Sequence, residues 1–185
     1  MSSPRGSHSG NIGSDYSHQP EPRIPLDLGE MIRPSRISFG GTAAIVTSMA
    51  LIVGLEAANA GRAGLISALL IAAVADNLTD SLSVHMYQES ERFERKDAFV
   101  GTLTNFGTRF VVCLSFVFVV ALLPRHVAVA AGIGWGMALL AVLTWILARH
   151  RQVSTVTEVV KHLGVAVAVI AVSRIVGQWI AAHVI

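Results

Sequence analysis

Two aspartates, Asp76 and Asp80, lie inside an apolar stretch that is long enough to cross a membrane. The stretch from Gly64 to Met86 reads GLISALLIAAVADNLTDSLSVHM. A carboxylate at membrane depth costs about 2.5–3.5 kcal/mol even on a lenient insertion scale, so it is a functional-site candidate by default. The spacing of the two acids places both on one face of a helix, about one turn apart. Such a face could bind a cation or a proton.

The residues that follow bear on which cation would bind. Carboxylate oxygens suit hard divalent cations, whereas the sulfur of Met86 or the imidazole of His85 would shift the preference toward softer transition metals. Ser83 and Tyr87 continue the stripe of Asp76 and Asp80 at helical spacing, so the stripe is polar for about three turns. One ion pair needs less polar surface than this, which favours a lined pathway. We take Asp76, Asp80 and Met86 as candidate metal ligands.

An acidic segment, QESERFERKD, separates this stretch from the next apolar one. Glu89, Glu91 and Glu94 could collect metal ions at a cytoplasmic mouth, and they complete the set of candidate metal ligands. The alternative is intrahelical pairing with the interleaved bases Arg92, Arg95 and Lys96, and the helical spacings favour this alternative.

The two aspartates also have a purely structural interpretation. Counting from the span ends places Arg109 and Arg174 at about the same membrane level as both acids. Two acids and two arginines would form a neutral cluster that joins three helices, because an arginine fork matches a carboxylate bidentately. The sequence leaves both interpretations open.

Composition indicates an integral membrane protein. The 185 residues are 52% hydrophobic and 14% charged, whereas a soluble domain has about 25% charged residues. The net charge of +2 is not gathered into a patch for nucleic acid. The single cysteine, Cys113, excludes an internal disulfide framework. The chain lacks a G-x-S-x-G, H-E-x-x-H or P-loop motif, so we expect neither an enzyme nor a bound cofactor.

The hydrophobic pattern predicts an all-α, polytopic fold with five transmembrane helices. Backbone groups in lipid must be satisfied internally, so each span of about 20 residues is expected to be a helix. The expected spans are 37–55, 64–87, 98–123, 127–148 and 163–185, with a polar segment before the last. Residues 1–36, rich in Ser, Gly, Pro and His, are expected to form a disordered cytoplasmic tail ahead of this 37–185 domain.

Basic residues predict the orientation in the membrane. Nine flank one side: Arg23, Arg33, Arg36, Arg92, Arg95, Lys96, Arg149, Arg151 and Lys161. Arg62 and Arg125 flank the other side. The positive-inside rule therefore predicts a cytoplasmic N-terminus and a multi-pass protein, in the cell or inner membrane if the source is prokaryotic.

Small residues in the fourth span, Gly132, Gly134 and Gly136, allow another helix to approach closely. The contact could lie within one chain or form the seam of a dimer, and the sequence does not choose between them.

Residues 37–54, ISFGGTAAIVTSMALIVG, resemble the first helix of the vacuolar iron transporter family, whose pattern is roughly I-V-x-G-x-N-D-G-I-V-T-x-x-A-x-x-x-G. The matching positions are Gly40, Ile45, Val46, Thr47, Ala50 and Gly54. Asp80-Ser-Leu-Ser83-Val84 with Glu89 is similar to the family's E-Y-V-S-V…E run, which puts Asp80 on an acidic position. Arg174-Ile-Val-Gly177 is similar to its Y-L-I-G.

The resemblance implies a homodimeric transporter that moves Fe²⁺ or related divalent metals such as Mn²⁺ out of the cytosol, in exchange for protons. The chain departs from the family in several places. The family's first-helix Asp falls on Ala43, a second-helix Met falls on Asp76, and the cytoplasmic metal-binding domain is reduced to about ten residues. The chain thus looks like a divergent short form.

Two functions follow as expectations. The first is a divalent cation exporter in the lipid bilayer, with the acids as its site. The second is a non-transporting membrane scaffold or partner subunit whose intramembrane charges are locked in salt bridges.

Overall fold

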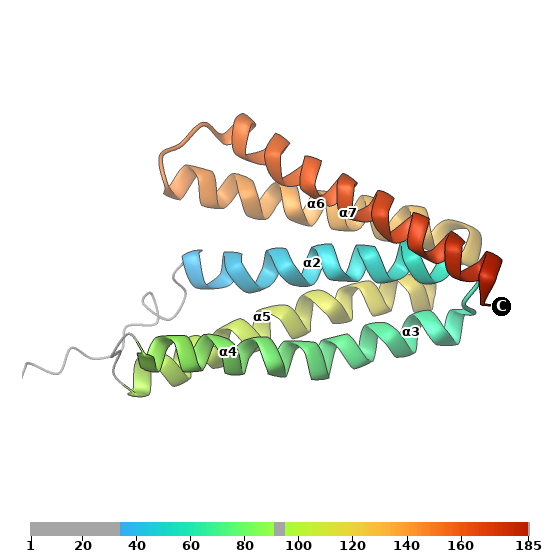
Figure 1. The fold of residues 1–185 in the computed structure, drawn as a ribbon. Helices are drawn as coiled ribbons and strands as arrows, with labels where there is room; N and C mark the ends of the chain where they lie inside the picture. The colour runs from blue at the N-terminus through green and yellow to red at the C-terminus, as the bar shows by residue number, and fades with distance from the viewer. Residues whose placement is uncertain (1–33, 91–94, 185) are drawn as a thin grey trace, which may run out of the picture.

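The structure, a computed structural model, describes residues 34–90 and 95–184, with side chains omitted at 34–39, 88, 89 and 95–98. Within these ranges every secondary-structure element is helical, and short non-helical connections join the helices. The helices are α2 (Pro34–Ala57), α3 (Arg62–Ile71), the π-helical turn η1 (Ala72–Asp76), α4 (Asn77–Ser90), α5 (Arg95–Leu122), α6 (Arg125–His150) and α7 (Thr155–His183). Because α3, η1 and α4 are continuous, they act as one long helix (Figure 1).

Five helical segments of the described chain are long and apolar enough to cross a membrane. They have 18 to 29 residues and a mean hydropathy of 1.5 to 2.0. This confirms the predicted all-α fold with five candidate spans. The orientation of the N-terminus stays a prediction, and the predicted tail lies almost wholly outside the described residues. The Glu91 and Glu94 positions also lie outside them.

Two boundaries differ from the sequence prediction. The polar segment before the last span is not separate from that span, because α7 already begins at Thr155. Its first turns are polar on the outside, where Lys161 Nζ donates to Glu158 Oε1 at 3.1 Å. The second span is not a uniform α-helix, since η1 interrupts it directly before the acidic pair.

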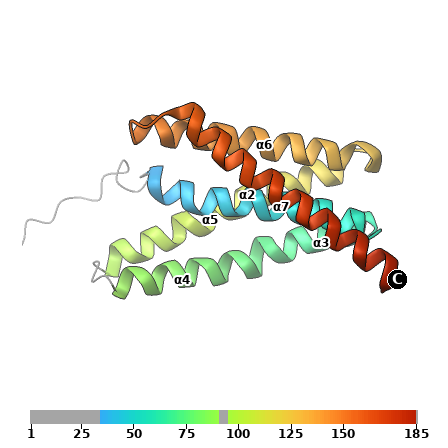
Figure 2. The same cartoon turned by 45° about the horizontal axis from the view of Figure 1, so that its top comes forward.

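Helix α2 lies at the centre of the bundle and packs against α5, α6 and α7. Figure 2 shows α7 crossing over α2 at an angle, while α5 lies beside α4. The buried core includes Met49 and Ile52 of α2, Leu69 of α3, Phe116 of α5 and Leu140 of α6. Each is at most 1% exposed. By contrast α4 contacts mainly α5, so the half of the second span that holds the acids is only partly covered.

Glycines set the closest helix approaches. A Cβ at Gly136 would lie 2.4 Å from Met49 Sδ, and one at Gly132 would lie 3.0 Å from Ile52 Cδ1. These two glycines therefore form a contact between α6 and α2 within the chain, whereas Gly134 faces open space. A Cβ at Gly177 would lie 2.1 Å from the Gly54 carbonyl oxygen, which makes this pair the crossing point of α7 and α2.

The bundle has two ends, a loop end and a far end. The loop end holds the start of α2, the end of α4 and the start of α5 (Figure 1, left). The far end holds the α2–α3 and α5–α6 connections. At the far end Arg62 donates to the carbonyl oxygens of Val120 (2.9 Å) and Ala121 (2.8 Å). These contacts satisfy carbonyls at the C-terminus of α5 and fix the α2–α3 connection against it.

Candidate intramembrane ion site

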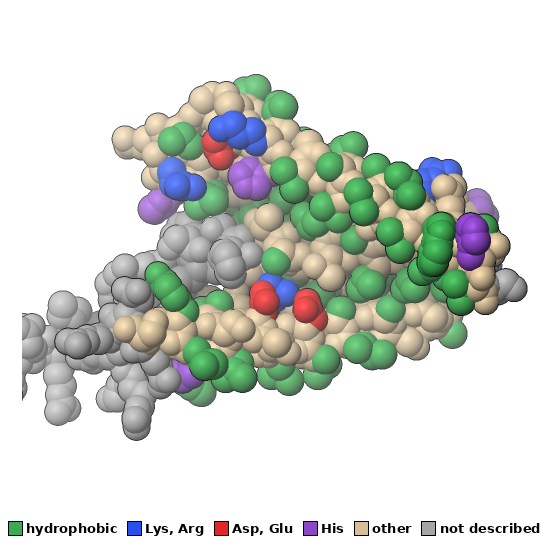
Figure 3. All heavy atoms as spheres, viewed as in Figure 1, with side chains coloured by type: hydrophobic (Ala, Val, Ile, Leu, Met, Phe, Trp, Pro, Cys, Tyr) green, Lys and Arg blue, Asp and Glu red, His purple; other side chains and the backbone are tan. Residues whose placement is uncertain are grey.

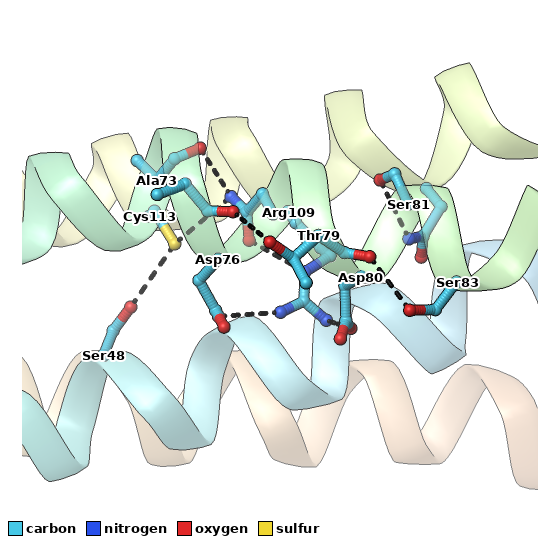
Figure 4. Close-up of polar contacts among 12 residues, drawn as sticks. Ser48, Ala73, Asp76, Thr79, Asp80, Ser81, Ser83, Arg109 and Cys113 are labelled. Atoms are coloured by element: carbon cyan, nitrogen blue, oxygen red, sulfur yellow. Dashed lines mark hydrogen bonds and ion pairs between the residues drawn. The ribbon is translucent and has the colours of Figure 1, made fainter.

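Arg109 of α5 is the centre of the candidate site. Its side chain is 2% exposed, and its guanidinium donates to three side chains of the neighbouring helix. Nε donates to Asn77 Oδ1 at 2.8 Å, Nη2 donates to Asp76 Oδ2 at 3.1 Å, and Nη1 donates to Asp80 Oδ2. Figure 4 shows the guanidinium between the two carboxylates. The planar fork of arginine suits this arrangement, in which separate nitrogens reach separate acceptors.

The local helix geometry presents all three acceptors to Arg109. The π-helical turn η1 ends at Asp76, and the backbone N–H of Asn77 still donates to the Ala72 carbonyl in the π pattern. The Asn77 side chain then donates to the Ala73 carbonyl at 2.9 Å, which provides this carbonyl with a partner. Turns of this type often occur at functional sites. Here the turn sets the rotation of α4 that points Asp76, Asn77 and Asp80 at α5.

The two carboxylates are much more exposed than their arginine. The side chain of Asp76 is 50% exposed and that of Asp80 is 40% exposed. Each uses one oxygen, Oδ2, toward Arg109. Figure 3 shows two acidic side chains and a basic one together along the edge of the second span, with apolar and uncharged side chains around them. The site thus holds two acids and one base, with a formal charge of −1 when all three are ionised.

The neutral cluster of two acids and two arginines is not what the structure contains, because Arg174 lies elsewhere. Its neighbour Ser173 contacts Gly54, whereas Ala44 packs with Ala73 and Cys113 beside the acids. Gly54 is ten residues farther along α2 than Ala44, about 15 Å. Arg174 is therefore near the far end, and it is exposed on α7. Counting from residue 163 missed this, since α7 starts earlier and crosses α2 obliquely.

Polar pairs continue from Arg109 toward the loop end between α4 and α5. Asn105 Nδ2 donates to Ser81 Oγ at 3.3 Å, and Thr102 Oγ1 and His85 Nδ1 are 3.2 Å apart. Asn105 is 2% exposed, and its Oδ1 has no hydrogen-bond partner. This oxygen lies against Gly40, where a Cβ would approach it to 2.2 Å. Only a glycine leaves room for the amide there.

Sequence reasoning missed Asn77, Asn105 and Gly40 as parts of the site. A signal existed for the two asparagines, because a carboxamide inside an apolar span needs internal hydrogen-bond partners. Asn77 also lies between the two acids in the sequence, and it is fully buried. No signal in the sequence indicated that Gly40 faces Asn105.

Among the remaining candidate ligands, Met86 has a described side chain, and it does not lie beside the acids. Met86 is 63% exposed, and it is six residues beyond Asp80 and thus on a different face of α4. Glu89 belongs to α4, but its side chain is outside the described residues, as are Glu91 and Glu94. Ser83 and Tyr87 are exposed on α4, as the predicted stripe requires. Among the described residues no group of three His, Cys, Asp or Glu side chains could hold a metal ion.

A second ion pair lies at the far end. Arg125 Nε donates to Glu56 Oε1 at 3.2 Å, with the Arg125 side chain 51% exposed. Glu56 lies in the last turn of α2 and Arg125 begins α6, so this pair joins the end of α2 to the start of α6. An exposed pair of this kind contributes little stability, about 0–1 kcal/mol.

No family model, curated protein or solved structure matches this chain. The resemblance to vacuolar iron transporters is therefore neither supported nor opposed by these comparisons.

Proposed function

We propose that this protein is an integral membrane cation transporter in which Asp76 and Asp80 bind the transported ion. The observation that supports this is the imbalance of charge around Arg109: two half-exposed carboxylates face one buried guanidinium. A lone negative charge in an apolar setting is costly. At an effective dielectric constant of about 20, a cation about 4 Å away would offset it by about 4 kcal/mol.

The geometry leaves room for such a cation. Arg109 donates to Oδ2 of each acid, and within the described part of the chain Oδ1 of each acid accepts no hydrogen bond. Two partly exposed carboxylates suit a hard divalent ion, which binds through one or two carboxylates and retains waters. The resemblance stated above favours a divalent metal such as Fe²⁺ or Mn²⁺, proton exchange and a homodimer, and these belong to the proposal.

A second function is favoured by a different observation. Each of the three guanidinium nitrogens of Arg109 has a partner, because Asn77 and both acids accept from it. A membrane scaffold or partner subunit with locked charges would show the same contacts. It would show no cation flux, and its acids would matter for stability alone.

Reconstitution in liposomes separates the two functions. The assay measures uptake of Fe²⁺, Mn²⁺, Zn²⁺ and Co²⁺ by the wild type, Asp80→Asn and the matched control Glu158→Gln. Glu158 pairs with Lys161 on the outside of α7, away from Arg109. A transporter gives flux that Asp80→Asn abolishes and Glu158→Gln retains. Equal flux in the wild type and Asp80→Asn would exclude the proposed site.

A further inference from the structure

The polarity of the second span differs between the two sides of the acidic pair, the loop-end side and the far-end side. Toward the loop end, the stripe continues as Ser83 and Tyr87, both exposed, with Tyr87 at 64%. Toward the far end, the sequence of α3 and η1 from Gly64 to Ala75 contains one polar side chain, Ser67. Along the second span, therefore, side-chain oxygens follow the acids toward the loop end, whereas Ser67 is the one such group toward the far end.

A tightly packed apolar layer fills the bundle core between the level of the acids and the far end. It consists of Met49, Ile52, Leu65, Leu69, Phe116 and Val120, each at most 3% exposed. Gly132 and Gly136 let α6 close over it, since their Cβ positions are already occupied by Ile52 and Met49. Phe116 is seven residues past Arg109 on α5, about 10 Å along the helix.

The space behind this layer is small. The cavity next to the Glu56–Arg125 pair, which Ile52, Leu65 and Val120 help to line, has a volume of about 10 Å³. That is room for about one water molecule. The loop-end half, by contrast, holds a groove of about 450 Å³ between α4 and α5. Ser81, His85 and Thr102 line it together with five apolar side chains, and it does not extend to the acids.

We propose that the acidic pair is reached from the loop end only, along Ser83 and Tyr87, and that the apolar layer around Met49, Leu69 and Phe116 is the gate that closes the far end. This inference rests on the proposed function, since it describes the access route to the same site. It assigns a role to residues that bind no ion: Met49 and Phe116 separate the site from the far side until α6 moves away from α2.

Cys113 reports on this gate. It is the single cysteine of the chain and is 2% exposed. It lies between the acids and the apolar layer, with its sulfur 3.7 Å from Ser48 Oγ and 3.8 Å from Asn77 Nδ2. A reagent from the far side must pass Met49 and Phe116 to reach it.

The first test measures which end gives access. Ser83→Cys and Ile71→Cys, each in a Cys113→Ala background, are treated with a membrane-impermeant thiol reagent in vesicles of known orientation. Ile71 is 66% exposed on the far side of the acids. The proposal expects labelling of Ser83→Cys from the loop end, at least about tenfold faster than from the far end, and no labelling of Ile71→Cys from either. Labelling of Ser83→Cys from the far end, or from neither end, would overturn it.

The second test opens the gate. Phe116→Ala, with Cys113 retained, should raise the far-side labelling rate of Cys113 at least about tenfold over the wild type. The matched control Phe118→Ala truncates the same residue type at a position of α5 that is 61% exposed, and should leave the rate unchanged. An unchanged rate in a folded Phe116→Ala protein would contradict the gate. The Ser83→Cys result stands even if Phe116→Ala does not fold.

Sidedness of labelling is measured without any transported ion. One-sided access together with absent metal flux would uphold the access route and reject the proposed function. Metal flux together with access from the far end would uphold the proposed function and reject the access route.

Discussion

Arg109 and Asp76 form an ion pair whose two sides differ sharply in exposure: the guanidinium is 2% exposed and the carboxylate 50%. The arginine is therefore part of the packed interior between α4 and α5, whereas the acid borders an open surface. This makes Arg109 a fixed internal counterion and leaves its acids the groups able to meet a ligand.

Arg109→Lys should destabilise the folded protein by about 1.5–3 kcal/mol. A lysine ammonium is a point charge on a flexible stem and cannot reach Asn77, Asp76 and Asp80 in the geometry of the guanidinium fork. Thermal unfolding in detergent measures the loss. Arg125→Lys is the matched control at the half-exposed Glu56 pair, and should change stability by less than about 1 kcal/mol. Similar losses in both variants would argue against a special role for Arg109.

Substituting the charged residues of the site one at a time should show that two acids share one arginine. Arg109→Gln removes the counterion of two acids and should destabilise more than Asp80→Asn, which leaves Asp76 paired. The double variant Asp80→Asn with Arg109→Gln should recover little of the stability lost in Arg109→Gln, because Asp76 is then left without a counterion. Adding Asp76→Asn should recover more. Full rescue by the double variant, read from unfolding temperatures, would instead indicate a simple one-to-one pair.

Gly40→Ala should destabilise the bundle by about 1–3 kcal/mol, because its Cβ would lie 2.2 Å from Asn105 Oδ1 and 3.0 Å from Arg109 Cγ. Gly107→Ala on α5 is the control. Nothing lies within 4 Å of its Cβ position, so the better helix propensity of alanine should stabilise it by up to about 1 kcal/mol. Unfolding temperatures measure both effects, and we expect a decrease for Gly40→Ala and an increase for Gly107→Ala. A neutral Gly40→Ala would mean that α2 and α5 are not this close.

Much of the fold could be predicted from the sequence, because long apolar runs in lipid have to be helices. The acidic pair was found the same way, since charge stands out against such a background. Its partner was predicted only in part. Arg109 was included, but Arg174 was placed at the wrong level because α7 begins earlier than predicted and crosses α2 at the contact of Gly177 with Gly54. The π-helical turn at Asp76 and the Gly40–Asn105 contact depend on tertiary geometry that no local pattern encodes.

Gly177→Ala tests that packing. Its Cβ would lie 2.1 Å from the Gly54 carbonyl oxygen and 2.8 Å from Ala57 Cβ, so α7 has to move away from α2. The expected cost is about 1–3 kcal/mol. Gly164→Ala, on the same helix with nothing within 4 Å, should be neutral or stabilising. If both variants unfold at the wild-type temperature, α7 does not cross α2 at this point.

The central claim is that Asp76 and Asp80 bind a transported cation, and metal flux into liposomes tests it most directly. We expect the wild type and Glu158→Gln to transport at least one of Fe²⁺, Mn²⁺, Zn²⁺ and Co²⁺. We expect the flux to fall at least about tenfold in Asp80→Asn, measured on protein that remains folded. Undiminished flux in Asp80→Asn, or no flux of any of these ions in the wild type, would contradict it.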